Sequence, residues 1–215
     1  MTFTFRPVDP AADAVLLHSW VSAARARFWG MVSATVQDVV EEYTRIAGSG
    51  HHQAFLGLDG GVPAFLMERY RPEESPLASV YNVQPGDTGM HLLVAAPAGP
   101  SIPGYTTCVM QSVMAHLFED PGTARVVVEP DSRNHKIHLL NQRVGFRASG
   151  LVTLPAVEQA PGCTETHQPE TGQPETSQPE TRKEALLSFC TRADFLATLT
   201  PILAANAAET VGEQR

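Results

Sequence analysis

The order of apolar and polar segments along the chain predicts a mixed α/β domain, with antiparallel strands early and a parallel crossover late. Two observations lead to this fold class. Residues 53–70 form two apolar runs around Asp59, Gly60 and Gly61, which predicts an antiparallel hairpin because glycine accepts the positive φ of tight turns. Residues 89–131 then follow the order strand, glycine- and proline-containing loop, helix and strand, as expected for a parallel crossover.

The first part of the chain is predicted to contribute one strand and two helices. Alternating apolar residues predict a strand over 3–8. Apolar residues at helical spacing follow from Ala11, and Gly30 is a natural stop for that helix. Thr35, with Asp38 three residues later, resembles a capping box, so a second helix should begin there and end at Gly48.

The elements after the hairpin are read in the same way. We expect strands and helices in alternation, with Gly145 capping the last helix: strand 89–97, helix 106–120, strand 124–131, helix 134–144 and strand 146–155.

A repeated segment interrupts this pattern. Gln-Pro-Glu-Thr occurs three times, beginning at Gln168, Gln173 and Gln178, with almost nothing apolar to bury. We interpret residues 162–182 as a disordered insert at a hairpin tip, because residues 184–199 return to a strand and a short helix. The prediction is a single domain over 1–215.

Composition excludes several classes of partner. The formal net charge is −8 and the basic residues form no dense run, so a nucleic-acid partner is not expected. The three cysteines are widely spaced, which fits a reducing compartment better than a disulfide scaffold. The sequence has no basic-then-apolar leader and no apolar stretch near the roughly 20 residues of a membrane helix, so we expect a cytoplasmic protein without a membrane partner.

A polar cluster follows the valine-rich strand near residue 128. Glu129, Asp131, Arg133 and Asn134 occur where an open α/β sheet usually presents its ligand crevice, which predicts one wall of a site. A second interpretation stays open, because Asp131 is also a good N-cap for the helix that begins near Asn134.

Several short motifs, spread along most of the chain, resemble the GNAT acyltransferase superfamily. They are HSW at 18–20, RFW at 27–29, MERY at 67–70, GDTGMHLLV at 86–94, RVVVEPDSRN at 125–134 and GF at 145–146. The closer resemblance is to the branch that acylates hydroxylated diamines and lysines in siderophore biosynthesis. It implies a mixed central sheet, splayed in its middle and flanked by helices, with acyl-CoA lying in the opening.

The resemblance also implies where acyl-CoA, as acetyl-CoA or succinyl-CoA, would bind. The pyrophosphate would lie at the N-terminus of the helix after residue 104, where backbone N–H groups and the helix dipole favour anions. This loop departs from the family pattern, because it contains Pro100 and Pro103 and has no basic residue. The expected CoA-binding residues are Leu93, Val94, Gly99, Gly104, Tyr105, Thr106 and Asn134.

In the same way, the resemblance assigns catalytic and acceptor residues. His91 is the expected general base, with Asp131 as its partner, since a histidine that titrates near neutrality can take the proton from the acceptor nitrogen. An ordinary strand histidine is the alternative for His91. The expected acceptor pocket contains Trp20, Trp29, Glu68, Tyr70 and Asp87, although large aromatic residues more often pack in a core. No metal is expected, because the histidines share no metal-ligand spacing.

The expected activity is therefore acyl transfer from CoA to an N-hydroxylated diamine such as N-hydroxycadaverine, which gives a hydroxamate. Three alternatives stay open: acylation of N6-hydroxylysine, an aminoglycoside-type acetyltransferase, and a CoA-binding module without turnover. A homodimer is possible, because the exposed strands of a small sheet often pair.

Overall fold

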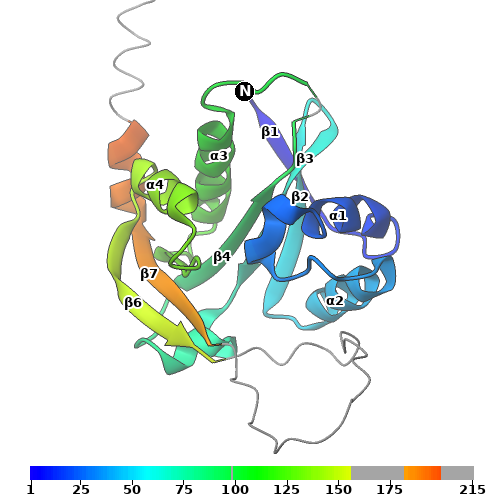
Figure 1. Ribbon diagram of the computed structural model, residues 1–215. Helices are drawn as coiled ribbons and strands as arrows, with labels where there is room; N and C mark the ends of the chain where they lie inside the picture. Colours follow the sequence, from blue (N-terminus) through cyan, green and yellow to red (C-terminus); the bar gives the residue numbers. More distant parts are fainter. Residues whose placement is uncertain (98, 156–181, 200–215) are drawn as a thin grey trace, which may run out of the picture.

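The computed structural model describes residues 1–97, 99–155 and 182–199, and Figure 1 shows them as one mixed sheet with helices on both faces. The predicted insert at 162–182 lies outside the described residues except for Arg182. No helix in the described part of the chain is long and apolar enough to cross a membrane.

The sheet has seven strands in the order β1-β2-β3-β4-β5-β7-β6. Neighbouring strands are antiparallel except β4 and β5, which are parallel. The strands are β1 Phe3–Pro7, β2 His52–Asp59, β3 Val62–Tyr70, β4 Asp87–Val94, β5 Arg125–Val128, β6 Arg147–Leu154 and β7 Lys183–Thr191. This agrees with the predicted fold class, including the early antiparallel strands and the late parallel crossover.

The parallel pairing of β4 and β5 is short. β4 and β5 are in register only from Asp87↔Arg125 to Gly89↔Val127. Beyond Gly89, β4 continues to Val94 and keeps its pairing with β3. The edge of β4 that faces β5 is therefore open from Met90 onward, and this is the splay expected in the middle of the sheet.

Helices cover both faces of the sheet (Figure 1). On one face, α1 (Ala14–Val21) and α2 (Val36–Gly48) pack on the sheet around Leu17, Tyr43 and Leu66. On the other face, α3 (Tyr105–Glu119) and α4 (His135–Arg143) pack over a second core. Its buried residues include Phe65, Met67, Met90, Val113 and Met114. Side chains alternate between the faces along β3 and β4, so Glu68 and His91 project toward the face that α1 and α2 cover.

Local sequence explains several element boundaries. Thr35 and Asp38 form the expected capping box, with reciprocal hydrogen bonds of 3.2 and 2.7 Å. Gly60 and Gly61 have the positive φ that the β2–β3 turn requires. α2 ends at Gly48 as expected, but the C-cap is Ser49 rather than Gly48, and the residue with positive φ is Gly50.

The helix predicted between Ala11 and Gly30 is interrupted. α1 ends at Val21, and a 3₁₀ helix, η1 (Ala24–Trp29), follows Ala23, whose backbone is extended. The Ser22 hydroxyl donates to the carbonyl of His18 at 2.6 Å, which satisfies one of the last carbonyls of α1. The apolar spacing continues through this break, so the pattern alone did not reveal it.

Candidate active site

A polar cluster lies where β4 and β5 separate. Glu68 of β3 stands directly opposite His91 of β4 in the antiparallel register. His91 is two positions beyond Gly89, the last residue paired with β5, and Glu129 is two positions beyond its partner Val127. These three side chains therefore project from the same face of adjacent chain segments, at the start of the opening.

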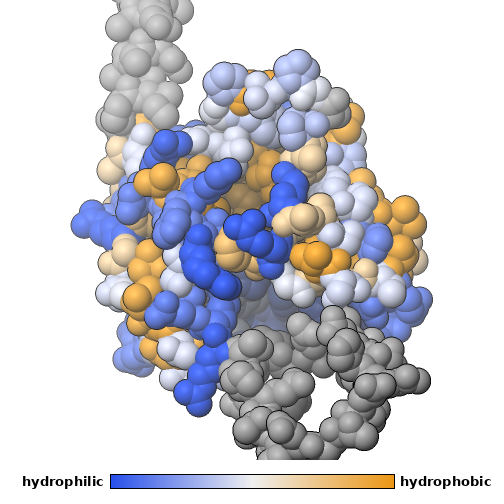
Figure 2. Space-filling view, viewed as in Figure 1, coloured by the Kyte–Doolittle hydropathy of each residue, from blue (hydrophilic) through white to orange (hydrophobic). Residues whose placement is uncertain are grey.

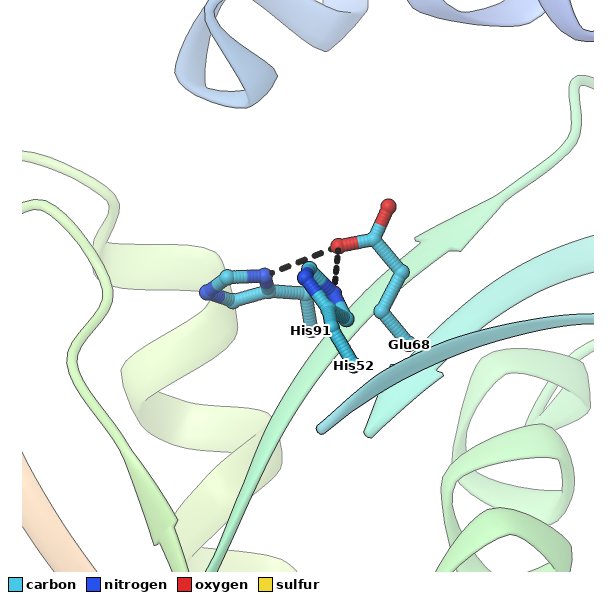
Figure 3. Close-up of side chains that lie close together, drawn as sticks. All are labelled: His52, Glu68 and His91. Atoms are coloured by element: carbon cyan, nitrogen blue, oxygen red, sulfur yellow. Dashed lines mark hydrogen bonds and ion pairs between the residues drawn. The ribbon is translucent and has the colours of Figure 1, made fainter. Parts of the chain in front are cut away.

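The His91 ring joins the two carboxylates, one through each nitrogen. Nδ1 lies 3.1 Å from Oε2 of Glu68, and Nε2 lies 3.1 Å from Oε1 of Glu129. Figure 3 shows the first of these contacts and a second histidine, His52, whose Nε2 lies 3.2 Å from the same oxygen of Glu68. Side-chain hydrogen bonds thus continue across β3, β4 and the end of β5 after the backbone pairing has stopped.

Further polar groups surround both carboxylates. The Tyr43 hydroxyl donates to Oε1 of Glu68 at 3.2 Å, and the Tyr70 hydroxyl donates to Oε2 of Glu129 at 3.0 Å. The Lys183 ammonium of β7 is 3.7 Å from Glu129. The side chains of both glutamates are only 7% exposed, whereas that of His91 is 39% exposed. Among these three residues, His91 is the one that solvent reaches.

Electrostatics make the His91 ring a cation. Burial alone would lower its pKa, but hydrogen bonds to Glu129 and Glu68 outweigh burial and raise the pKa to about 10. Burial likewise opposes ionisation of Glu68, yet hydrogen bonds from His52 and His91 lower its pKa to about 2. The pKa of Glu129 is also lowered, by His91 and Lys183 against the effect of burial. At neutral pH the cluster is an imidazolium between two carboxylates.

Asp131, the expected partner of His91, has a different partner. Arg133 binds both of its carboxylate oxygens, at 2.8 and 2.7 Å, and the backbone N–H of Arg133 donates to it at 2.9 Å. These hydrogen bonds lower the pKa of Asp131 to about 2 despite partial burial. In the structure both ring nitrogens of His91 are bonded to glutamates, Glu68 and Glu129, and Asp131 is bonded to Arg133.

The residues expected in the acceptor pocket divide into two groups. Glu68 and Tyr70 belong to the cluster, and the Trp29 ring lies edge-on to His91 with 6.1 Å between centroids. Trp20 is buried in the core under α1. Asp87 is bound by Arg125 at 2.7 and 2.8 Å and by the Tyr81 hydroxyl at 3.0 Å, so its carboxylate is already satisfied.

The residues expected to bind CoA lie along the opening. Leu93 and Val94 pair with β3 and leave their other edge toward the separated β5. The Val94 carbonyl accepts a hydrogen bond from Arg25 of η1. Asn134 is the first residue before α4, and its side chain makes no capping hydrogen bond.

The loop before α3 provides the expected helix N-terminus. Gly104 precedes α3 with φ +79°, and the helix has no side-chain cap and no acidic residue in its first turn. Gly99 and Thr106 are exposed near this end. Tyr105 points elsewhere, because its hydroxyl donates to Asp59 of the β2–β3 turn at 3.0 Å.

Three described side chains could offer a metal one ligand atom each. The ligand atoms of His52, Glu68 and His91 lie within 4.8 Å of one another. A metal would have to displace the proton on Nδ1 of His91, because metals bind only the unprotonated ring nitrogen. These three residues lie far apart in the sequence and are brought together by the register of the β-sheet. Their spacing along the chain therefore gave no sign of this group.

Glu129 belongs to the polar segment that predicted one wall of a site, but it was not among the expected catalytic or acceptor residues. It lies in the same EPD motif as Asp131, and only the strand geometry decides which carboxylate meets His91. His52 and Tyr43 were also missed, because their positions in the site depend on the pairing of β2 and the packing of α2.

A sheet that opens between two parallel strands, with an uncapped helix N-terminus after the first of them, defines an acyltransferase-type fold. The family comparison identifies it further: residues 9–154 match the model of the acetyltransferase (GNAT) domain, and the chain belongs to this family.

Two curated relatives are similar over much of the chain. N(6)-hydroxylysine O-acetyltransferase of Escherichia coli is 26% identical over 145 residues, which are 67% of this chain and 46% of the relative. Lysine N-acyltransferase MbtK of Mycobacterium sp. (strain MCS) is 27% identical over 134 residues, or 61% of this chain and 54% of the relative. The chain spans about half the length of these relatives.

Solved structures share the fold. An uncharacterised protein from Bacillus halodurans has a TM-score of 0.72 at 24% identity, covering 92% of this chain and 88% of that one. The aminoglycoside acetyltransferase AAC(6')-Ib, in complex with paromomycin and acetyl-CoA, has a TM-score of 0.69 at 20% identity, with coverage of 91% and 96%. These likenesses concern the fold alone.

Proposed function

We propose that the protein is an acyl-CoA-dependent N-acyltransferase that forms a hydroxamate on an N-hydroxylated amine, as a step in siderophore biosynthesis. The names of the two curated relatives, which both concern acylation of a lysine or hydroxylysine, support this class. The observation that carries the proposal is the His91 ring, bonded through both nitrogens to Glu68 and Glu129, at the start of the splay.

The charge on His91 favours a particular kind of nucleophile. An ordinary alkylamine has a pKa of about 10.4 and must lose a proton before it can attack. With a pKa of about 10, the ring of His91 is already protonated at neutral pH and cannot take that proton. A hydroxylamine nitrogen is largely uncharged at neutral pH, so it needs no deprotonation before attack. The site therefore suits an N-hydroxylated acceptor better than a simple amine.

The proton transfers can be balanced within the cluster. The acceptor nitrogen attacks the thioester carbon, the C–N bond forms, the C–S bond breaks, and CoA leaves as a thiolate. The attacking nitrogen becomes acidic, so a carboxylate of low pKa such as Glu129 can take its proton. The His91 imidazolium gives a proton to the thiolate. A proton shift from Glu129 to His91, across their 3.1 Å contact, restores the starting state. In this proposal His91 acts with Glu129 rather than with Asp131.

The opening beside β4 is the proposed acyl-CoA site. Leu93 and Val94 would line the pantetheine, and Asn134 would contact it from the other side of the opening. The N-terminus of α3, with Gly99, Gly104 and Thr106, would receive the pyrophosphate. Acetyl-CoA and succinyl-CoA are both candidates for the donor.

Thiol release tests the proposal. The donors are acetyl-CoA and succinyl-CoA, and the acceptors are N-hydroxycadaverine, cadaverine, N6-hydroxylysine and kanamycin. We expect release with a hydroxylated acceptor and little with cadaverine. Equal rates with cadaverine would contradict the argument from His91. Turnover of kanamycin alone would favour an aminoglycoside-type enzyme, and CoA binding without any release would favour a non-catalytic module.

Replacement of the central histidine provides the matching variant. His91→Ala should lower turnover roughly 100-fold or more, because both proton transfers pass through its pair with Glu129. His51→Gln is the control, since His51 lies outside the cluster. An unchanged rate in folded His91→Ala protein would remove His91 from the mechanism.

A further inference from the structure

A cationic cavity lies on the face of the sheet that α1 and α2 cover, beside the proposed reaction centre. It has a volume of about 180 Å³ and is lined by Arg27, Phe28 and Arg133. Arg27 and Phe28 come from η1, and Arg133 comes from the segment between β5 and α4. In Figure 2, hydrophilic residues flank a hollow between α1 and α4.

Two guanidinium groups share one aromatic ring in this cavity. The Arg27 guanidinium carbon is 4.5 Å from the centroid of the Phe28 ring, and that of Arg133 is 6.0 Å from the same centroid. Both distances fall within the range of a cation–π contact. The Phe28 ring thus contacts one guanidinium from each of two segments, and an anion between two such cations would relieve their mutual repulsion.

Among the described residues, one of these two cations forms no ion pair. Asp131 neutralises Arg133 and uses its Nε and one terminal nitrogen, so the second terminal nitrogen stays available. None of the ion pairs among the described residues includes Arg27, which is exposed. Arginine presents a planar fork of donors that matches a carboxylate, and such pairs are often bidentate.

The cavity is adjacent to the His91 cluster. Trp29, the neighbour of Phe28, lies against the His91 ring, and Asp131 is two residues beyond Glu129. Asp131 forms a bridge with Ala185 of β7, and it binds the Arg133 guanidinium that lines the cavity.

We propose that Arg27 and Arg133 form a subsite for a carboxylate on the substrate, with Phe28 supporting both guanidiniums and Asp131 positioning Arg133. This inference rests on the proposed acyl transfer and narrows its substrate class. The carboxylate can belong to an amino-acid acceptor such as N6-hydroxylysine or to a dicarboxylic acyl group such as succinyl. A diamine acceptor would instead bring its distal ammonium toward the Arg27 guanidinium, which disfavours N-hydroxycadaverine.

Steady-state kinetics of arginine variants test the subsite. We expect Arg27→Gln and Arg133→Gln to raise the KM of the carboxylate-bearing substrate about 10- to 100-fold with a smaller change in kcat, as expected for the loss of hydrogen bonds to a charged group. Arg27→Lys, which keeps the charge but loses the fork, should give an intermediate KM. Arg143→Gln is the control, because Arg143 is an exposed arginine in the last turn of α4.

The substrate panel separates the two sources of the carboxylate. With acetyl-CoA as donor, a KM rise for N6-hydroxylysine but not for N-hydroxycadaverine assigns the subsite to the acceptor. A rise with succinyl-CoA but not with acetyl-CoA assigns it to the acyl group. Unchanged KM values in all these arms would overturn the subsite while leaving the proposed acyl transfer intact.

A binding measurement keeps the two proposals distinguishable if the wild-type protein shows no turnover. Calorimetric titration of N6-hydroxylysine and of succinyl-CoA into the wild type and Arg27→Gln then provides the test. Weaker binding of either ligand to the variant would support the subsite although the proposed activity had failed. Equal binding, or none in the wild type, would overturn the subsite as well.

Discussion

The substitution Glu129→Gln tests the description of the polar cluster most directly. It keeps the size of the side chain but removes the charge that faces Nε2 of His91 at 3.1 Å. Hydrogen bonds to Glu129 and Glu68 together raise the pKa of His91 to about 10, and the bond to Glu129 is the larger contribution. We therefore expect the pKa of His91 to fall in the variant, and the folded protein to become less stable at neutral pH.

The size of the destabilisation follows from burial. Removing one member of a buried ion pair costs about 3–5 kcal/mol, and a single hydrogen bond to a charged group contributes about 1.5–3 kcal/mol. The Glu129 side chain is 7% exposed, but that of His91 is 39% exposed, so solvent screens part of the interaction. We expect a loss of about 2–3 kcal/mol, which for a domain of this size lowers Tm by about 4–12 °C.

The pH dependence has a definite sign. The folded-state pKa of His91 lies above its ordinary value of 6.5, so its stabilising contribution is complete below pH 6.5 and disappears as pH rises through about 10. The Tm difference between the wild type and Glu129→Gln should therefore shrink between pH 7 and pH 10. Thermal melts across this range measure it, with Glu74→Gln as an exposed control.

A direct titration completes the test. NMR detection of the imidazole resonances, assigned with His91→Gln, gives the pKa of His91 in both proteins. If His91 titrates near 6.5 in the wild type and does not change in Glu129→Gln, the ring is not held between two carboxylates. A Tm difference that is independent of pH would likewise refute the reasoning about the charge on His91.

Three further predictions concern other parts of the molecule. Asp87→Asn should lower the free energy of unfolding by about 3 kcal/mol, because Arg125 loses its buried partner. The KM values of the folded variant should stay unchanged. A raised KM for the acceptor would instead return Asp87 to the acceptor pocket. Gly104→Ala should lower the free energy of unfolding by about 1–2 kcal/mol because Gly104 has a left-handed φ, although there is space for the added methyl group. Thermal melts with and without CoA will measure this loss. An unchanged Tm would show that the backbone at this position adapts freely. Deleting residues 164–181 should leave Tm and turnover nearly unchanged, because Leu154 and Lys183 are paired at the ends of β6 and β7 on either side of the deletion. A large fall in Tm or turnover would show that the segment is needed.

Sequence reasoning succeeded where a short motif determines the local structure. The capping box at Thr35 and Asp38 and the glycine turn of the first hairpin were both predicted, whereas the separation of β4 from β5 was implied by the family resemblance. It failed at the break after Val21, because apolar spacing continues across it and the Ser22 hydroxyl leaves no periodic signal.

Only part of the site was predicted, because contacts between side chains of different strands depend on how the strands pair. The structure brings together His91 and Glu68, which the sequence analysis had placed in different roles, and their contact depends on the register of β3 and β4, which a long connection rather than a tight turn joins. Glu129 and Asp131 are two positions apart, so strand alternation turns both toward the same face. Only the packed structure shows that Glu129 meets His91 and that Asp131 holds Arg133.

The array of Glu68, His91 and Glu129 also determines how these positions can be varied in a library. Each member neutralises its neighbours, so changing one position alone leaves an uncompensated charge in a mostly buried setting. The three positions should therefore behave as one unit, with strongly non-additive effects. A library that randomises them together should return folded members that are either charge-balanced or wholly apolar. Libraries at single positions should return mostly destabilised members, so selection for stability at this site should act on triplets.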